Sequence, residues 1–410
     1  MAAPVSAPIT EPRAIPAPLF NACFVLFVIN AAFFPTAYFA NWWITDPNGF
    51  GIPIDFVNVW SAGKLVLDGH PAWAYDWDIQ KQVQVVLLGQ TFPGHFAWHY
   101  PPPFLAVAAF LAQFPYAAAF IGWVSISFVP YLGAMRAIVG RPFGWLLAAA
   151  FPVVLTNTLV GQNGFLTASL VGGMLVLLPT RPVLAGICLG LLSYKPQYGL
   201  LFPLVLIAAS QWTVFITAGI VAAAIAGASW LAFGTESWQA FLSWLPMFSQ
   251  AFLTEGRAPW GKMQSIFALV RYFGGSEPLG WAFQWTMIAA VAAALVWVWR
   301  SRVRYSLKAA GLATGTLLVT PYLFLYDVMV LAIAVGFLVR TGLSDGFRSY
   351  ELPALGGMAF LLMFYPLFAA PTGFGATLIV AALIARRCLA PRTRATSSPA
   401  LPINIGQFQT

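Results

Sequence analysis

Long apolar runs, separated by short polar or Pro- and Gly-containing breaks, fill most of this 410-residue sequence. The first run, from about Leu19 to Ala40, can cross a bilayer, because about 20 apolar residues are enough to span one. Hydrophobic residues make up 60% of the chain and charged residues 8%, against about 25% charged residues in a soluble domain. A soluble globule could not bury this much apolar surface, which argues against a soluble enzyme, a disordered chain and a nucleic-acid-binding protein.

The apolar runs predict an all-α polytopic membrane protein with about twelve transmembrane helices. The 31 prolines and 35 glycines indicate many interrupted helices rather than a plain bundle. Between disordered tails predicted at 1–18 and 391–410 lies one membrane domain, 19–390, with long loops at about 41–100 and 234–278. The predicted spans are 19–40, 101–140, 143–160, 163–179, 182–194, 196–210, 212–233, 279–299, 309–323, 327–340, 352–370 and 373–387.

The charged residues separate into two groups on this layout. If the N-terminus is cytoplasmic, most of the 20 Lys and Arg residues fall on the cytoplasmic side, and the two long loops hold most of the 12 acidic residues. We therefore predict a multi-pass protein of the bacterial inner membrane, with both termini cytoplasmic and both long loops periplasmic. The basic residues on the cytoplasmic side are Arg13, Arg136, Arg141, Arg181, Arg300, Arg302, Arg304, Lys308, Arg340, Arg348, Arg386, Arg387, Arg392 and Arg394.

Each long loop contains a stretch with helical periodicity. In residues 76–88 the apolar residues recur on one face, and Asp76 and Asp78 stand where a helix N-terminus favours negative charge. Residues 237–253 repeat the pattern, with Pro246 as a break. Two helices that lie on the membrane surface and flank a cleft would suit a lipid-borne substrate.

Asp55 lies in the first long loop among large apolar residues. Such surroundings raise the pKa of a carboxylate, which suits a general base. If this stretch is helical, Asn58 shares a face with Asp55 and becomes a candidate for substrate binding. Two structural alternatives stay open from the residues alone: Asp55 caps a helix, or it pairs with Lys64.

Polar residues also stand at several span ends that are predicted to face outward. These candidates for substrate binding are His99, Tyr100, Gln162, Asn163, Lys195, Tyr326 and Asp327. Lys195 is the one basic residue outside the loops and the cytoplasmic surface, and a lysine within the membrane is costly and usually functional. We predict that Lys195 binds an anion; the alternative is a structural pairing with Asp327.

Five short motifs follow one another along the chain. They are Asp55-Phe56, Gly69-His70-Pro71, Tyr100-Pro101-Pro102, Gly161-Gln162-Asn163 and Lys195-Pro196. In this order they resemble glycosyltransferase family 87, over about residues 20–390. Members of that family are polyprenyl-phosphate-mannose-dependent α-mannosyltransferases of the GT-C class. The resemblance therefore implies a GT-C-like fold and a catalytic base in the first outer loop, where Asp55 stands. Some members carry histidine-rich sequence after the proline of a late span, whereas this chain has PYLFLYD at 321–327.

The resemblance implies transfer of a hexose, expected to be mannose, from a polyprenyl-phosphate donor to a lipid or glycan acceptor, with inversion at the sugar. The residues agree with this, because the chain shows no Gly-rich phosphate loop for a nucleotide sugar, and a donor used outside must cross the membrane on a lipid. Asp55 would take the proton of the acceptor hydroxyl. The leaving phosphate would be neutralised by Lys195 and, from the second loop, by Arg257, Lys262 or Arg271.

The expected partners are the polyprenyl-phosphate sugar, the lipid or glycan acceptor and membrane lipids, with no nucleic acid. Beyond Asp76 and Asp78 the sequence shows no compact carboxylate cluster, so no metal ion or other cofactor is expected. Two other classes stay open: a flippase or exporter of lipid-linked sugars, and a non-catalytic membrane scaffold. The large, Trp-rich outer loops favour the enzyme, because a carrier needs a path open to both faces and this chain lacks inner polar loops of similar size.

Overall fold

The computed structural model describes residues 14–390, so almost all of both predicted tails lies outside it. Within that range every regular element is a helix, and the extended backbone forms just two isolated bridges. The prediction of an all-α protein is confirmed. The helices are α1 (Ala17–Phe39), α2 (Phe56–Leu67), α3 (Trp77–Leu88), α4 (Leu105–Leu111), α5 (Tyr116–Val139), α6 (Phe143–Ala149), α7 (Val153–Val160), α8 (Gly164–Leu177), α9 (Pro182–Leu191), α10 (Leu201–Ala208), α11 (Trp212–Ser249), α12 (Ile266–Tyr272), α13 (Glu277–Arg300), α14 (Tyr305–Leu318), α15 (Val330–Asp345), α16 (Glu351–Met363), α17 (Tyr365–Phe368) and α18 (Thr372–Leu389).

Short 3₁₀ and π turns join several of these helices. They are η1 (Pro71–Tyr75), η2 (Pro102–Phe104), η3 (Leu192–Tyr194), η4 (Pro196–Gly199), η5 (Gln250–Thr254), η6 (Trp260–Lys262) and η7 (Leu325–Met329).

Six helices of the described chain are long and apolar enough to cross a membrane alone: α1, α5, α11, α13, α15 with η7, and α18. The pair α6 and α7 gives a seventh candidate, bent by 59° at a break that contains Pro152. Several other predicted crossings correspond to apolar helices of 10–17 residues, among them α8, α9, α10 with η4, and α16. The chain is therefore a multi-pass membrane protein, and the number of about twelve crossings stays a prediction.

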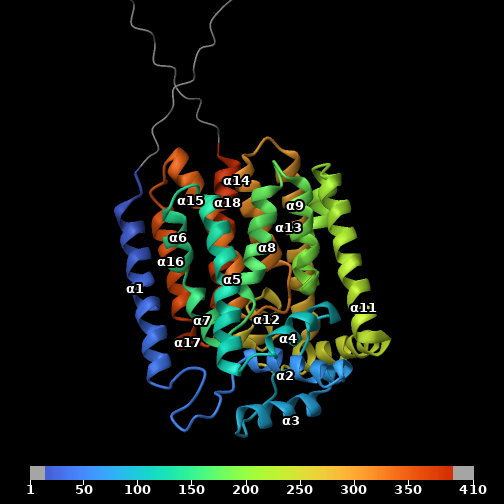
Figure 1. Cartoon of the computed structure of the whole chain (residues 1–410). Helices are drawn as coiled ribbons and strands as arrows, with labels where there is room; N and C mark the ends of the chain where they lie inside the picture. Colours follow the sequence, from blue (N-terminus) through green and yellow to red (C-terminus); the bar gives the residue numbers. More distant parts are fainter. Residues whose placement is uncertain (1–13, 391–410) are drawn as a thin grey trace, which may run out of the picture.

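The two ends of the helix bundle differ in what they carry (Figure 1). α1 begins and α18 ends at one end, which we call the terminal end, and α2, α3 and α12 lie at the other, which we call the loop end. Arg136, Arg300 and Arg387 stand in the last turns of α5, α13 and α18, which reach the terminal end. These three arginines, all predicted to be cytoplasmic, thus lie at the same end of the bundle, and the orientation of the chain in the membrane stays a prediction.

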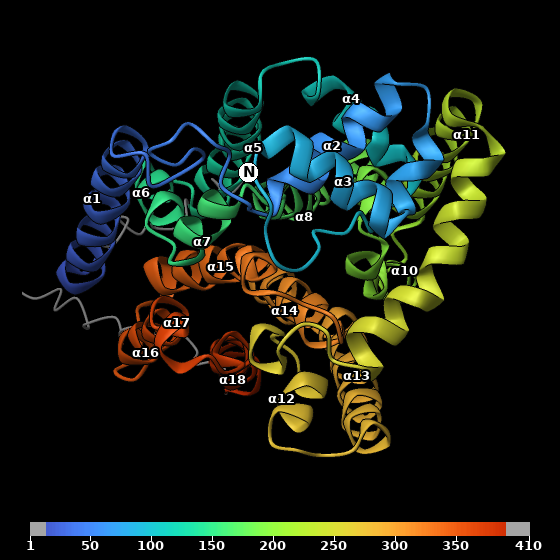
Figure 2. The ribbon, with the colours of Figure 1, turned by 90° about the horizontal axis from the view of Figure 1, so that it is seen from below.

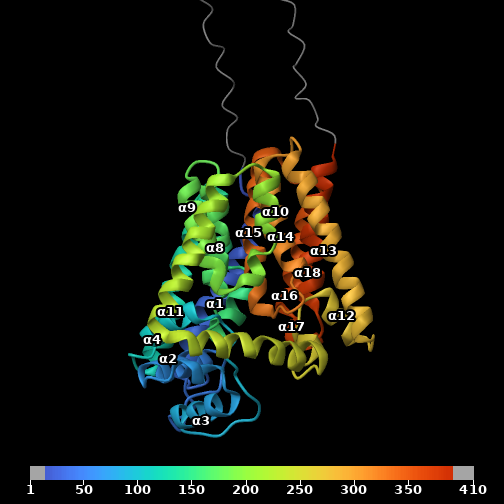
Figure 3. The same cartoon turned by 90° about the vertical axis from the view of Figure 1, so that its right-hand side faces the viewer.

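The first long loop forms α2 and α3, which pack on each other at the loop end. Asp76 caps α3 as expected, because its Oδ1 accepts from the backbone N–H groups of Asp78 and Ile79, each at 2.9 Å. The buried face of α3 is polar, however: Gln80 Oε1 accepts from Ser61 Oγ of α2 at 2.5 Å. α3 lies beyond α2, on the side away from the long helices (Figures 1 and 3). That it lies on the membrane surface stays a prediction.

α11 changes direction at Gly234, where φ is 76° and ψ is 171°. A residue with a Cβ rarely adopts this conformation, so the glycine ends the apolar span. The helix after the break, residues 235–249, runs across the loop end from the side of α9 toward α13 (Figures 2 and 3). α11 contacts η1 of the first loop and η2, which directly follows that loop, so it brings the second long loop against the first.

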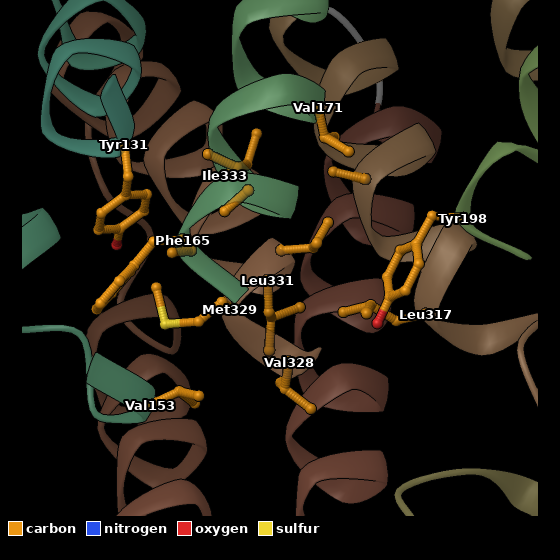
Figure 4. Close-up of a cluster of buried hydrophobic side chains, with 14 of the residues drawn as sticks. Tyr131, Val153, Phe165, Val171, Tyr198, Leu317, Val328, Met329, Leu331 and Ile333 are labelled. Atoms are coloured by element: carbon orange, nitrogen blue, oxygen red, sulfur yellow. The ribbon is translucent and has the colours of Figure 1, made fainter. Parts of the chain in front are cut away.

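α15 is the centre of the bundle: almost all of it is buried, whereas α1 is largely exposed along its length. It packs against α5, α8 and α14. Figure 4 shows this core, in which Phe165 and Tyr131 lie beside Met329 and Ile333. Because η7 leads directly into α15, residues 325–327 are held by the most buried helix of the molecule.

Candidate active site

Asp55 stands directly before α2, at the loop end. Its carboxylate caps no backbone N–H group of α2. Lys64, the other structural partner considered, instead places its Nζ over the Trp60 ring, 5.3 Å from the centroid. Neither structural explanation of Asp55 holds, and its side chain is only partly buried. The carboxylate is therefore available for chemistry.

Gln162 holds the carboxylate of Asp55 from the break between α7 and α8. Its Nε2 donates to Asp55 Oδ2 at 3.0 Å, and its Oε1 accepts from the hydroxyl of Tyr100 at 3.1 Å. Gln162 and Tyr100 are both buried. Three residues that the sequence places in separate segments are thus joined in one hydrogen-bonded chain.

Gly161 explains why the chain can bring Gln162 so close. It ends α7 in a left-handed conformation, with φ at 67°. A Cβ at this position would lie 2.5 Å from the ring of Phe120 and 2.8 Å from Cβ of Phe56. Because Phe56 directly follows Asp55, this close packing fixes the position of the two segments relative to each other.

Lys195 and Asp327 form a buried ion pair, with 2.6 Å between Lys195 Nζ and Asp327 Oδ1 and side-chain exposures of 4% and 8%. The second carboxylate oxygen of Asp327 accepts from the backbone N–H of Phe324 at 3.1 Å. The pairing left open by the sequence is therefore present. The Asp327 charge acts on Asp55, so the ion pair and the base belong to one site.

The second long loop contributes Lys262. The segment that follows it pairs with the strand-like residues before η7, through a bridge between Met263 and Phe324 and a 2.6 Å hydrogen bond from Gln264 N to Leu323 O. Lys262 itself is exposed, and its charge reaches Asp55. The bridge thus places a cation from residues 234–278 beside the carboxylate from residues 41–100.

The two arginines predicted to assist are engaged elsewhere. Arg257 Nε lies 2.8 Å from Glu255 Oε2, in an exposed pair, and its guanidinium lies 4.8 Å from the centre of the Trp77 ring. Arg271 donates to the backbone oxygens of Gly275 and Thr254. Their contacts stabilise the second loop.

Aromatic side chains line the site beside these charges. The His99 ring lies 5.5 Å from Phe248 and 6.3 Å from Tyr322, and Phe248 lies 4.7 Å from Tyr322. Tyr326 is partly exposed, and its hydroxyl lies close enough to Asp55 to lower the pKa of that carboxyl. Sequence reasoning missed Phe248 as a site residue, although it continues the apolar periodicity of residues 237–253.

The shifted pKa values of Asp55 and His99, both in the first loop, bear on the chemistry of the site. Burial raises the pKa of Asp55, and the hydrogen bond from Gln162 and the charge of Lys262 offset part of that rise. Burial, with a smaller contribution from the charge of Lys195, lowers the pKa of His99 to about 4. His99 is therefore neutral at neutral pH, whereas Asp55 is a stronger base than an ordinary aspartate.

The structure brings together most of the residues predicted for the site. The residues in this cluster are Asp55, His99, Tyr100, Gln162, Asn163, Lys195, Lys262, Tyr326 and Asp327. Asn58 is buried, and its side-chain oxygen has no hydrogen-bond partner among the described residues. Its hydrogen bond to Asp55 is between backbone groups, from N–H to the Asp55 oxygen at 3.1 Å. Residues 14–390 hold no group of three or more His, Cys, Asp or Glu side chains placed to bind a metal ion.

This arrangement can carry out one kind of chemistry with its own groups. A partly accessible carboxylate of raised pKa can take a proton from a hydroxyl. Lysines near it can neutralise an anion that departs from the same centre.

Comparison with known proteins places the cluster in a family. The family model described as glycosyltransferase family 87 matches residues 98–321, which is more than half of the chain. Asp55 lies before the matched range and Asp327 after it, and both contact residues inside it, Gln162 and Lys195. Neither the curated proteins nor the solved structures give a significant match to the chain.

Proposed function

Because the chain belongs to glycosyltransferase family 87 and is a membrane glycosyltransferase, we propose that it transfers a hexose from a polyprenyl-phosphate donor to a lipid or glycan acceptor. Mannose is the sugar we propose first. The observation that carries the proposal is the partly accessible Asp55 carboxylate, held by Gln162 beside the charge of Lys262. The reaction would take place on the outer face of the bacterial inner membrane, in a GT-C-like fold.

The proposed reaction is a single displacement. The acceptor hydroxyl attacks the anomeric carbon of the donor sugar, and the bond between that carbon and the phosphate oxygen breaks. Asp55 takes the hydroxyl proton, and polyprenyl phosphate leaves with the electron pair of the broken bond. One displacement at one carbon inverts the anomeric configuration.

The leaving phosphate needs a cation, and the two lysines of the site differ in how free they are to supply one. Lys262 is exposed and lies within electrostatic reach of Asp55. Lys195 is buried and already paired with Asp327. We therefore assign the first contact with the phosphate to Lys262 and a supporting contact to the remaining N–H donors of Lys195.

An apolar groove supports a donor that is a lipid. It has a volume of about 390 Å³, lies between α9, α10 and α11, and reaches Ser193 and Pro196. These residues flank the segment that carries Lys195. A prenyl chain lying in this groove would bring its phosphate toward the lysine, whereas a soluble nucleotide sugar would gain nothing from it.

Asp55→Asn tests the proposal. Asparagine keeps the shape of the side chain but cannot accept a proton, so turnover of a labelled polyprenyl-phosphate sugar should fall by about 10²–10⁴-fold. Donor binding should survive, because the base acts on the acceptor. The measurement is release of polyprenyl phosphate by purified, folded protein, which a flippase, an exporter or a scaffold would not produce.

The matched control is Asp76→Asn, which changes another loop aspartate that caps α3. It should cost about 0.3–1 kcal/mol of local stability and leave turnover close to that of the wild type. Wild-type turnover in Asp55→Asn, together with a collapse in Asp76→Asn, would contradict the assignment of the base.

A further inference from the structure

The side-chain amide of Gln162 can point only one way. Its Oε1 accepts from the hydroxyl of Tyr100 at 3.1 Å and from the backbone N–H of Asn163 at 3.3 Å. A backbone N–H donates and never accepts, so the oxygen of the amide must face it. The amide NH₂ group then has to face Asp55, where Nε2 lies 3.0 Å from Oδ2.

An amide N–H donates more strongly to an ionised carboxylate than to a neutral carboxylic acid, because the negative charge strengthens the hydrogen bond. The contact therefore favours the ionised form of Asp55, which is the form that takes a proton. It also occupies Oδ2 and leaves Oδ1 to meet a substrate. The Tyr326 hydroxyl reaches the same carboxylate, and about four lone-pair sites on the two oxygens leave room for it as well.

We propose that Gln162 is a positioning residue of the transfer reaction, rather than a substrate-binding one. It holds Asp55 by Oδ2, keeps the carboxylate ionised, and leaves Oδ1 as the atom that takes the acceptor proton. This rests on the proposed function, in which Asp55 is the base. Tyr100 and the backbone of Asn163 act indirectly: they hold the side-chain amide of Gln162, which in turn holds the carboxylate of Asp55.

The backbone supports this role independently of the hydrogen bonds. Gly161 packs so closely on Phe56 that a Cβ would lie 2.8 Å from that residue's Cβ. The residue before Gln162 is thus locked against the residue after Asp55. A side chain meant to bind a mobile substrate would not need its own segment packed against that of the base in this way.

The test is the pH dependence of turnover in Gln162→Leu and Gln162→Asn. Leucine removes the amide, and asparagine keeps an amide but shortens the side chain by one methylene. Losing a hydrogen bond to a charged group changes the protonation equilibrium of Asp55 by about 10–100-fold. The acid limb of the profile of turnover against pH should therefore move to higher pH by about one to two units. The KM for the polyprenyl-phosphate donor should stay near the wild-type value, because Gln162 does not touch the phosphate.

Tyr100→Phe provides a milder variant in case the glutamine variants fold poorly. The amide keeps its bond to Asn163, so the acid limb should move in the same direction by less than about one pH unit. Gln284→Leu is the matched control. Gln284 is a buried glutamine that bridges backbone groups of Phe267 and Leu318, at 3.4 and 3.2 Å. Its loss should lower stability and leave the acid limb in place.

The outcomes separate this inference from the proposed function. If wild-type protein transfers no sugar, the proposed function fails and takes the inference with it. If the wild type is active and Asp55→Asn is not, but the Gln162 variants lose turnover equally at every pH, Gln162 is structural and the inference is overturned. A raised KM for the donor with an unmoved acid limb would overturn it too, because Gln162 would then bind substrate.

Discussion

Two buried ion pairs lie at opposite ends of the molecule, and their hydrogen bonding differs. At the terminal end Arg387 joins Glu351 through two contacts of 2.6 Å, from Nε to Oε1 and from Nη2 to Oε2. The backbone oxygen of Gly346 and the backbone N–H of Arg348 complete the partners of this pair. At the loop end the ammonium of Lys195 has one hydrogen bond among the described residues, to Asp327 Oδ1.

The difference in hydrogen bonding indicates that the Arg387–Glu351 pair is structural, whereas the Lys195–Asp327 pair can bind a ligand. A bidentate guanidinium with its remaining groups satisfied has little capacity to bind anything else. A lysine ammonium has three donors, and here one is used, while the rings of Tyr100 and Tyr198 lie 6.0 and 5.6 Å from Nζ. The comparison therefore indicates that the pair at the terminal end holds α16 and α18 together, whereas the pair at the loop end can still meet an anion.

The largest expected effect is on stability at the terminal end. Arg387→Met should lower the free energy of unfolding by about 3–5 kcal/mol, because Glu351 would stay buried without its partner. The double variant Arg387→Met/Glu351→Leu should recover most of this loss. Turnover of the folded protein should stay at the wild-type level in both, as measured by denaturation and sugar transfer on the same samples. Lost turnover in the stable double variant would contradict the claim that the Arg387–Glu351 pair is structural only.

Removing both charges of the ion pair at the loop end should change turnover but not stability. Lys195→Met/Asp327→Leu removes both charges, so it should fold nearly as stably as the wild type. Its turnover should nevertheless fall by about 10²-fold, because the buried ammonium that supports the leaving phosphate beside Lys262 is gone. Full turnover in this double variant would show that both ion pairs are structural. The contact with the phosphate would then be assigned to Lys262 alone.

The smallest of the three effects concerns Lys262. Lys262→Ala should raise the KM for the polyprenyl-phosphate donor by about tenfold, since an exposed charge contributes less than a buried one. Stability should stay within about 0.5 kcal/mol of the wild type, as is usual for a surface position. The control is Lys64→Ala, which removes a first-loop cation that lies over Trp60 instead. An equal rise in KM for both variants would mean that general surface charge, rather than Lys262, attracts the donor.

The arrangement of the helices could be predicted from the sequence wherever one residue decides the local backbone. Asp76 was predicted to begin a helix, and it caps α3. The span predicted to end at residue 233 does end there, because Gly234 leaves the helical conformation. The polar buried face of α3 could not be predicted from hydrophobic periodicity, because Gln84 and Gln80 are buried by hydrogen bonding and not by apolar contact.

Most members of the active-site cluster were named from the sequence, whereas most of its contacts were not; the pairing of Lys195 with Asp327, left open as an alternative, is the exception. Charge and position placed Asp55, Gln162 and Lys195 on one side of the membrane. That Gln162 holds Asp55, rather than a substrate, depends on how Gly161 packs on Phe56, which no local pattern encodes. The position of Lys262 likewise depends on a bridge between segments about 60 residues apart.

The long separation between partners also has a consequence for how the protein is made. Asp55 and Gln162 are 107 residues apart in the chain. A ribosome adds about 5–20 residues per second, so Gln162 is synthesised about 5–20 s after Asp55. The interval between the synthesis of Lys195 and that of Asp327 is longer, because 132 residues separate them. A growing chain therefore has no complete site until about four fifths of the 410 residues have been synthesised. Until then, every ribosome-bound chain that already contains Asp55 carries the base without its full surroundings.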